Sequence, residues 1–152
     1  KKIFNINASF KNVKSTQLCT TLGDAYGNTI STVEHILSAL YGLDIDNIFI
    51  DLDNNEVPVY DGSSKNFVDE IDRVGVSDQQ SFKEYVKILR PIEVSEGKKI
   101  ARVLPFSYTM FSTEINYSNK VIGKQSISLM LNKDIYRKVF YKLILQLGNY
   151  KS

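Results

Sequence analysis

Hydrophobic and polar positions change period several times along the chain, and the first clear pattern is helical. Between Val33 and Leu40 the apolar residues recur every three or four positions, which predicts an amphipathic helix with one face against a core. Ser31 and Glu34 match a capping box, in which each side chain satisfies a backbone N–H that the first helical turn leaves unpaired. Gly42 is expected to stop this helix.

The remaining periodicity predicts two further helices and a larger number of short strands. A second helix is expected over 67–74, where Gly75 ends it, and a third over 133–147. Strands are expected at 3–10, 13–21, 48–53, 57–59, 85–89, 92–94, 100–104, 108–117 and 122–131. Turns are expected at 24–28, 61–64 and 95–97. This order of elements indicates an α+β fold rather than a regular βαβ winding.

A polar stretch from Asp78 to Phe82 is the one candidate linker. It predicts a first domain over 1–79 and a second, β-rich segment over 80–152. At 152 residues, with 43% hydrophobic and 24% charged residues, the chain can bury a core and does not have the composition of a disordered protein.

Charge and cysteine content narrow the class of protein. A net charge of +2 lacks the strong positive field expected of a nucleic-acid-binding protein. A single cysteine, Cys19, excludes an internal disulfide and fits a reducing compartment. No apolar run is long enough to span a bilayer, and no signal peptide opens the chain. We therefore expect a cytoplasmic protein with no nucleic-acid partner and no transmembrane segment. Because the first residue is Lys1 rather than Met, an upstream segment is expected to be missing.

The strongest candidate for chemistry is the pair formed by Glu34 and His35 at the start of the first predicted helix. The positive end of the helix dipole disfavours imidazolium, and neutral imidazole is the form that binds a metal. Glu34 could then act as general base for a metal-activated water. The alternative is structural, with Glu34 as the acidic half of the capping box and His35 as an ordinary helix residue.

Ligand arithmetic limits the metal hypothesis. A catalytic zinc takes three protein ligands and leaves one position open. The chain contains one histidine and one cysteine, and no carboxylate lies at a recognisable ligand spacing from His35. The sequence therefore predicts at most a partial metal site.

Two other charged regions are candidates for binding. The acidic region from Asp44 to Asp61 does not fit a calcium-binding loop. If Asp51 is taken as the first ligand, Glu56 occupies the position that requires glycine, and Gly62 occupies the position of the bidentate glutamate. Basic residues of the second half fit either a solvated face or a site for a phosphate-bearing substrate, and the sequence leaves both open. These residues are Lys98, Lys99, Arg102, Lys120 and Lys124.

Three strings, in their order and spacing, resemble the zinc-dependent UDP-3-O-acyl-N-acetylglucosamine deacetylases of lipid A biosynthesis. They are ISTVEHILSAL at 30–40, GLDIDN at 42–47 and EVPVYDGSS at 56–64. Further similarity covers KILRPIEV at 87–94 and IGKQS at 122–126, and the resemblance runs from near Lys1 to about Lys138.

The resemblance implies a fold and a set of roles. The fold is a two-layer α/β sandwich domain, with helices on one face of a mainly antiparallel sheet, followed by part of a second, similar domain, and the active site lies between the two. Residues 1–79 would form the first domain without its N-terminal strands, and 80–152 an incomplete second one. The resemblance makes His35 a zinc ligand, Glu34 the general base and Cys19 a neighbour of the acyl-substrate region. The implied substrate is a UDP-linked acylated amino sugar.

Several family features are absent from this sequence. They include the other two zinc ligands, a His and an Asp in a His-Lys-x-x-Asp motif, a later histidine that assists as general acid, and an Ala-Arg-Thr-Phe-Gly-Phe string. From about Phe140 the sequence differs from that of the family, which predicts an aberrant tail produced by a frameshift or premature stop. The resemblance thus implies a fragment of a zinc hydrolase with an incomplete zinc site and no activity of its own. Two alternatives stay open: a non-catalytic binding or scaffold domain that keeps the fold, and a site completed by a second chain or partner.

Overall fold

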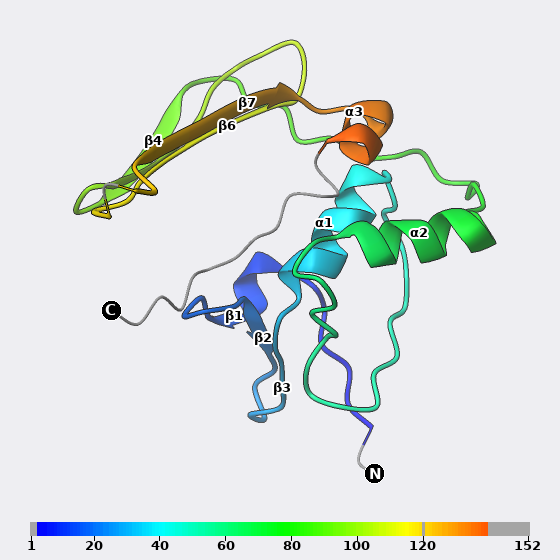
Figure 1. Cartoon of the computed structure of the whole chain (residues 1–152). Coiled ribbons are helices and arrows are strands. Elements are labelled where there is room, and N and C mark those ends of the chain that lie inside the picture. The colour runs from blue at the N-terminus through cyan, green and yellow to red at the C-terminus, as the bar shows by residue number, and fades with distance from the viewer. Residues whose placement is uncertain (1–2, 120, 140–152) are drawn as a thin grey trace. The chain divides into compact units, whose positions relative to one another are not determined.

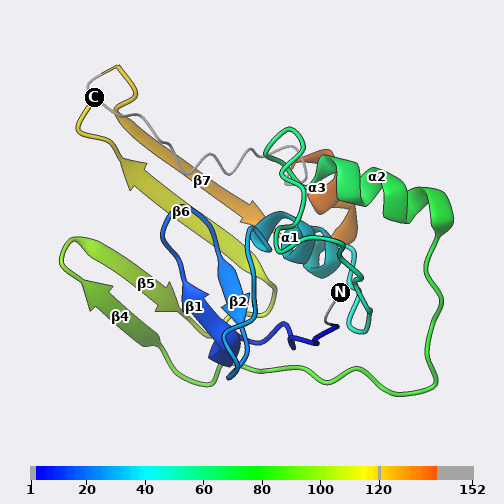
Figure 2. The ribbon, with the colours of Figure 1, turned by 90° about the horizontal axis from the view of Figure 1, so that it is seen from below.

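The structure, a computed structural model, describes residues 3–119 and 121–139. Figures 1 and 2 show its elements from two sides. The chain separates into two compact units: one contains the residues up to Ser77 together with those from Lys133 onward, and the other spans Asp78–Asn132. The predicted division of the family fold between residues 79 and 80 stays a prediction.

A small antiparallel sheet opens the first unit. After a short 3-10 helix, η1 (Phe10–Asn12), the strands β1 (Val13–Ser15), β2 (Thr21–Gly23) and β3 (Thr29–Ile30) pair in the order β1-β2-β3. The turn predicted at 24–28 is confirmed, because the Asp24 carboxylate accepts hydrogen bonds from the backbone N–H groups of Tyr26 and Asn28, at 2.8 and 2.9 Å.

Three helices accompany this sheet: α1 (Glu34–Gly42), α2 (Lys65–Val74) and α3 (Lys133–Lys138). Helix α1 contacts both α2 and α3 (Figure 1). Leu22, Val33 and Val57 form the buried centre of the core. The half-buried apolar side chains around it are Ile6, Ile30, Ile36, Leu37, Leu52 and Phe67. The apolar face predicted for the first helix is thus the face that packs.

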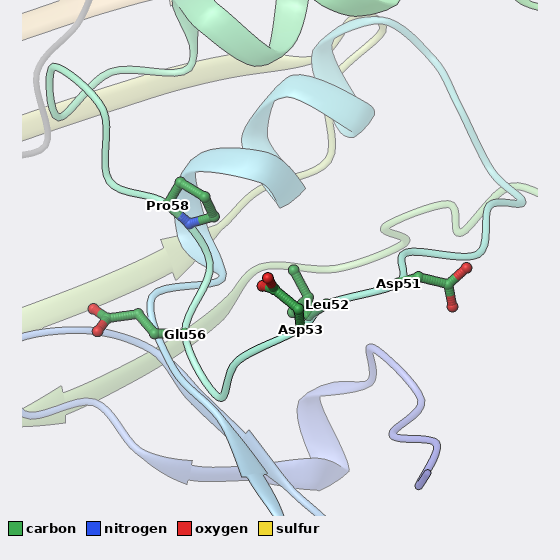
Figure 3. Close-up of a pocket in the computed structure, with 5 residues that line it drawn as sticks. All are labelled: Asp51, Leu52, Asp53, Glu56 and Pro58. Carbon is green, nitrogen blue, oxygen red and sulfur yellow. The ribbon is translucent and has the colours of Figure 1, made fainter. Parts of the chain in front are cut away.

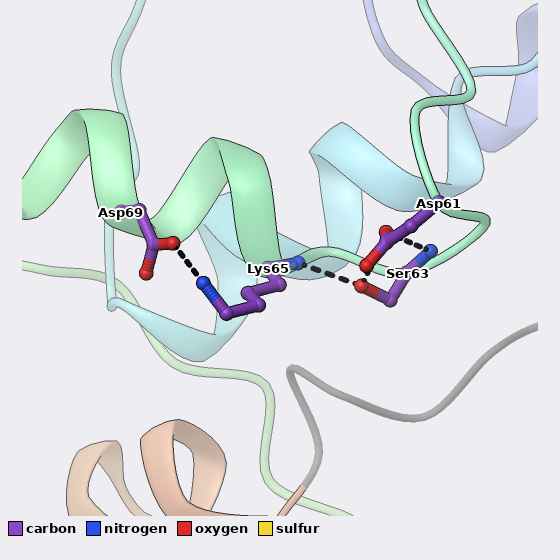
Figure 4. A network of polar contacts seen from close by, with 4 residues as sticks. All are labelled: Asp61, Ser63, Lys65 and Asp69. Atoms are coloured by element: carbon purple, nitrogen blue, oxygen red, sulfur yellow. Dashed lines mark hydrogen bonds and ion pairs between the residues drawn. The ribbon is translucent and has the colours of Figure 1, made fainter.

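A chain of hydrogen bonds fixes the start of α2 (Figure 4). Asp61 Oδ1 accepts from the backbone N–H and the hydroxyl of Ser63, at 3.0 and 2.7 Å, and Ser63 Oγ accepts from the Lys65 N–H at 3.1 Å. The Ser63 hydrogen bonds lower the pKa of Asp61. Lys65 also pairs with Asp69 one turn later. The predicted turn is confirmed, and Gly75 ends the helix at φ 80°, as expected.

Helix α3 docks on α1 through one aromatic ring. Tyr136 is 2% exposed, and its hydroxyl lies 2.9 Å from Ser38 Oγ, within hydrogen-bond distance. Its ring lies directly over Gly42, where a Cβ would fall 2.3 Å from ring carbon Cγ. Arg137 donates to the Asp72 carboxylate at 2.8 and 3.0 Å, which links α3 to α2. The third helix begins where predicted, and its expected residues 140–147 lie outside the described part of the chain.

The second unit consists of two antiparallel hairpins. Strands β4 (Ile92–Glu96) and β5 (Lys99–Val103) turn at Gly97, which has φ 58°, and β6 (Met110–Asn116) pairs with β7 (Lys124–Met130). Figure 2 shows both hairpins. These strands confirm the ones predicted at 92–94, 100–104, 108–117 and 122–131.

Other predicted strands are wrong. Residues 3–10, 48–53 and 85–89 form no strand in the structure, and 13–21 holds β1, the loop after it and the first residue of β2 rather than one strand. Residues 57–59 form no strand either: an isolated parallel bridge joins Ser31 to the preceding Glu56, and Pro58 has no N–H with which to extend it. Alternating apolar and polar residues indicate that one side of a segment is buried, whereas a strand also needs a neighbouring strand with which to pair.

The α+β class is confirmed: residues 3–119 and 121–139 form three α-helices and small antiparallel sheets. Among the described residues no helix has the length and apolar character needed to cross a bilayer.

Candidate functional site

The candidate site lies at the first turn of α1, where Glu34 and His35 are the first two helical residues. The chain reaches this turn through Thr32, whose φ of 60° is in the left-handed region that β-branched residues rarely adopt. Ser31 before it bridges to Glu56, and Val33 after it is the N-cap. The helix is therefore aimed by a sharp change of backbone direction at Thr32.

The predicted capping box is wrong. The N-cap is Val33, and no side chain caps the helix. Ser31 Oγ instead donates to the backbone carbonyl of Asn55 at 3.2 Å, and Glu34 Oε2 accepts from the backbone N–H of Thr20 at 2.9 Å. Partners that are distant in sequence have replaced the local reciprocal bonds. Glu34 therefore does not cap its own helix.

The expected role of Gly42 is only partly correct. Helix α1 does end there, but the left-handed residue at this end is Asp44, with φ 64°. Gly42 is needed for a different reason, because the Tyr136 ring occupies the space that a side chain would take. Sequence alone does not distinguish a helix-ending glycine from one that admits a neighbouring ring.

The structure brings the Cys19 loop against Glu34. Thr20 binds the start of α1 at two points: its N–H donates to Glu34, and its carbonyl accepts from the Val33 N–H at 3.3 Å. Cys19, the preceding residue, is half-buried, with its Sγ 3.7 Å from Thr21 Oγ1. Sequence reasoning singled out Cys19 but missed Thr20, because no local signal marks a backbone N–H whose partner lies 14 residues away.

His35 is 3% exposed, and its Nδ1 has no hydrogen-bond partner within the part of the chain that the structure describes. Leaving a buried polar atom unpaired costs about 1–3 kcal/mol, so such an atom calls for a partner. Imidazole is a common zinc ligand, and His35 fits that role as one ligand of a set. No group of three or more His, Cys, Asp or Glu side chains among the described residues is arranged to hold a metal. Residues 3–119 and 121–139 thus contain no complete metal site of these side chains.

The acidic region forms a shallow depression of about 600 Å³, which Leu52 and Pro58 line together with Asp51, Asp53 and Glu56. In Figure 3 the Asp51 carboxylate points away from the Glu56 carboxylate, so the three acids do not converge on one point. Glu56 Oε1 is instead engaged by the hydroxyl of Thr32, at 2.8 Å. This geometry agrees with the mismatch to a calcium loop.

Three of the five basic residues named for the second half pair with carboxylates on their own hairpins, and Lys120 lies outside the described residues. Arg102 pairs with Glu93, and Lys124 lies 2.9 Å from Glu114. Lys99 lies 4.0 Å from Glu96. These exposed ion pairs favour the interpretation as a solvated face over the phosphate site.

Comparison with known proteins identifies the family. Residues 2–142 match the LpxC family, described as UDP-3-O-acyl N-acetylglycosamine deacetylase. A protein of that activity from Syntrophus aciditrophicus is 40% identical over 133 residues, which cover 88% of this chain and 42% of the relative. One from Campylobacter hominis is 42% identical over 132 residues, covering 87% and 45%. One from Campylobacter jejuni subsp. jejuni is 41% identical over 136 residues, covering 87% and 46%.

The chain spans less than half the length of these curated relatives. The family match includes the segment that carries Cys19, Glu34 and His35. With a match over nearly the whole sequence and relatives at about 40% identity, this chain belongs to the UDP-3-O-acyl-N-acetylglucosamine deacetylase family and corresponds to a part of it.

Proposed function

We propose that this chain supplies the water-activating carboxylate and one zinc ligand of a zinc-dependent deacetylase. In this proposal Glu34 is the general base, His35 is the zinc ligand and Cys19 lies beside the acyl-bearing part of the substrate. The substrate is UDP-3-O-acyl-N-acetylglucosamine, and the reaction cleaves its N-acetyl amide with water to give the free amine and acetate. The observation that carries the proposal is the adjacency of Glu34 and His35 at the start of α1 in a chain of this family.

Glu34 is held in a way that suits a general base. The Thr20 N–H binds Oε2 and fixes the carboxylate, and this bond engages only one of the two carboxylate oxygens. The other oxygen can accept a proton from a water molecule within hydrogen-bond reach. The proton taken from water then has to reach the leaving nitrogen of the amide, because an amine is expelled only after protonation.

His35 is held in a way that suits a ligand with fixed orientation. Its ring is buried in the first unit, so the imidazole loses few conformations when it binds. When bound, zinc would supply Lewis acidity for the amide carbonyl and the attacking water. No group of three or more His, Cys, Asp or Glu side chains among the described residues is arranged to hold a metal, and a catalytic zinc takes three protein ligands. We therefore propose that this polypeptide alone has negligible turnover and weak zinc affinity.

Location and cofactor complete the proposal. A sugar-nucleotide substrate and a single half-buried, unpaired cysteine support a cytoplasmic protein. Zinc is proposed as the metal because imidazole is a common ligand of catalytic zinc and His35 is buried with an unpaired ring nitrogen.

The first experiment measures zinc content and deacetylation of UDP-3-O-acyl-N-acetylglucosamine by the purified chain, next to His35→Ala and Glu34→Gln. We expect no measurable turnover in any of the three, and weak zinc binding that only His35→Ala abolishes. Zinc-dependent turnover by the unsubstituted chain would contradict the proposed inactivity.

The second experiment supplies the rest of a relative in trans. The part of the Campylobacter hominis relative that this chain does not cover is mixed with the chain in the same assay. We expect turnover that both variants lose, while Glu34→Gln keeps its zinc. Turnover that survives Glu34→Gln would exclude Glu34 as the base.

A further inference from the structure

We infer that Glu56 is a positioning residue for the Glu34–His35 pair, because its carboxylate holds Thr32 in the left-handed backbone conformation that aims the start of α1. The inference rests on the proposed function for what the pair does, and on the geometry around Thr32 for how it is held. It assigns a role to the first residue of the EVPVYDGSS string, which neither the base nor the zinc ligand explains.

Thr32 is the residue that needs holding. Its φ of 60° places the branched Cβ close to its own backbone, a conformation that is a genuine outlier for a β-branched residue. Such conformations persist only where the surroundings enforce them, and they gather at functional sites. Thr32 lies two residues before Glu34, so any relaxation of its backbone would redirect both site residues.

Glu56 contacts Thr32 through its side chain, and the residues on either side of Glu56 bind Ser31 through their backbones. The Thr32 hydroxyl donates to Glu56 Oε1 at 2.8 Å. Thr32 is 5% exposed, so water is a poor substitute for that acceptor. The segment around Glu56 also binds Ser31: the Ser31 N–H donates to the Asn55 carbonyl at 2.9 Å, and the Val57 N–H donates to the Ser31 carbonyl at 3.1 Å.

The other side of Thr32 is held independently. The Val33 N–H and the Glu34 carboxylate both bind Thr20. Thr32 therefore lies between two anchored segments, and its own side chain has one hydrogen-bond partner, Glu56. The charge of Glu56 strengthens this bond, since hydrogen bonds to ionised acceptors are about twice as strong as neutral ones.

Nuclear magnetic resonance on the full chain reads this conformation directly. A residue with positive φ has its amide and α protons unusually close, which gives a strong intraresidue cross-peak between them. We expect that cross-peak at Thr32 in the unsubstituted chain and its weakening in Glu56→Ala, together with shifted His35 ring resonances. Glu56→Gln keeps an oxygen acceptor and is the matched control, so it should stay close to the unsubstituted chain.

Zinc titration of the same samples connects the conformation to the site. We expect Glu56→Ala to weaken the His35-dependent zinc affinity about tenfold, the low end of what losing an outer-shell partner costs. Thr32→Gly adopts positive φ without strain, so adding Glu56→Ala to Thr32→Gly should change neither the cross-peak pattern nor the affinity. Comparing Thr32→Gly with the Thr32→Gly, Glu56→Ala double variant also tests the role of Glu56 if Glu56→Ala alone does not fold.

The inference is overturned if Glu56→Ala keeps the Thr32 cross-peak, or if Glu56→Ala weakens zinc binding equally with Thr and with Gly at position 32. It is also overturned if Glu56→Gln is as damaging as Glu56→Ala. A chain whose zinc binding ignores His35→Ala refutes the proposed ligand instead, and the cross-peak at Thr32 then still decides the role of Glu56.

Discussion

Substituting Gly42 by alanine should undock α3 from α1. An added Cβ would lie 2.3, 2.4 and 2.4 Å from Cγ, Cδ1 and Cδ2 of Tyr136. Carbon atoms pack at about 3.5–4.0 Å, so the ring has to retreat by more than about 1 Å. Tyr136 is 2% exposed, and its hydroxyl is within 2.9 Å of Ser38 Oγ, so a ring shift of that size also breaks a hydrogen bond.

The expected cost follows from three contributions. Forcing an extra carbon into a packed contact costs about 1–3 kcal/mol. Losing the Tyr136–Ser38 hydrogen bond accounts for about 0.5–1.5 kcal/mol within that range. In the opposite direction, alanine is better than glycine in a helix by up to about 1 kcal/mol. We therefore expect Gly42→Ala to lower the free energy of unfolding by about 1–2 kcal/mol.

Urea unfolding followed by circular dichroism measures this change, and a Tyr136→Ala background is the control. With the ring removed, only the helix preference remains, so Gly42→Ala should become neutral or stabilising by up to about 1 kcal/mol. This reversal of sign is specific to the contact. An equal destabilisation in both backgrounds would refute the assignment of Gly42 to the Tyr136 ring.

Three further predictions concern polar contacts. The Arg137 hydrogen bond lowers the pKa of Asp72. This exposed pair therefore stabilises the fold fully at pH values above the ordinary carboxyl pKa, and the stabilisation is lost as the pH falls through the lowered pKa. Acid titration of unfolding should show this loss, worth at most about 1 kcal/mol, and Asp72→Asn should remove it. Ser63→Ala removes the hydroxyl that accepts from the Lys65 N–H and donates to Asp61, and should lower the free energy of unfolding in urea by about 1 kcal/mol. No change would mean that water replaces the hydroxyl. Glu34→Gln keeps an acceptor for the N–H that it binds and should shift stability by less than about 0.5 kcal/mol, so a larger loss would show that the charge itself is structural.

Helices, tight turns and hairpins follow from neighbouring residues, and here the sequence predicted them well. The apolar spacing of 33–40 marked α1, Gly75 marked the end of α2, and the Asp24 turn and the four strands of the second unit were found. Each of these depends on interactions within a few residues, or between strands joined by a short loop. Alternation alone over-predicted strands, because it does not say whether a partner strand is present.

The candidate site shows the same contrast between local and long-range interactions. The sequence indicated the family and singled out Glu34, His35 and Cys19, whose assigned roles remain predictions. It gave Glu34 the wrong hydrogen-bond partner, because the capping box is a local rule and the N–H that binds Glu34 comes from Thr20. It also gave no sign that Thr32 is left-handed or that Glu56 reaches it.

What the sequence determined by itself is therefore the family and the helix that begins at Glu34 and His35, and it predicted these two residues and Cys19 as site residues. Only the tertiary structure decided how they are held: Thr20 on Glu34 from 14 residues away, Glu56 on Thr32 from 24, and Tyr136 over Gly42 from the far end of the described chain. The physical reason is that periodicity and turn chemistry act over one or two turns of chain, whereas a buried donor takes whichever acceptor the packed fold places within 3 Å or so.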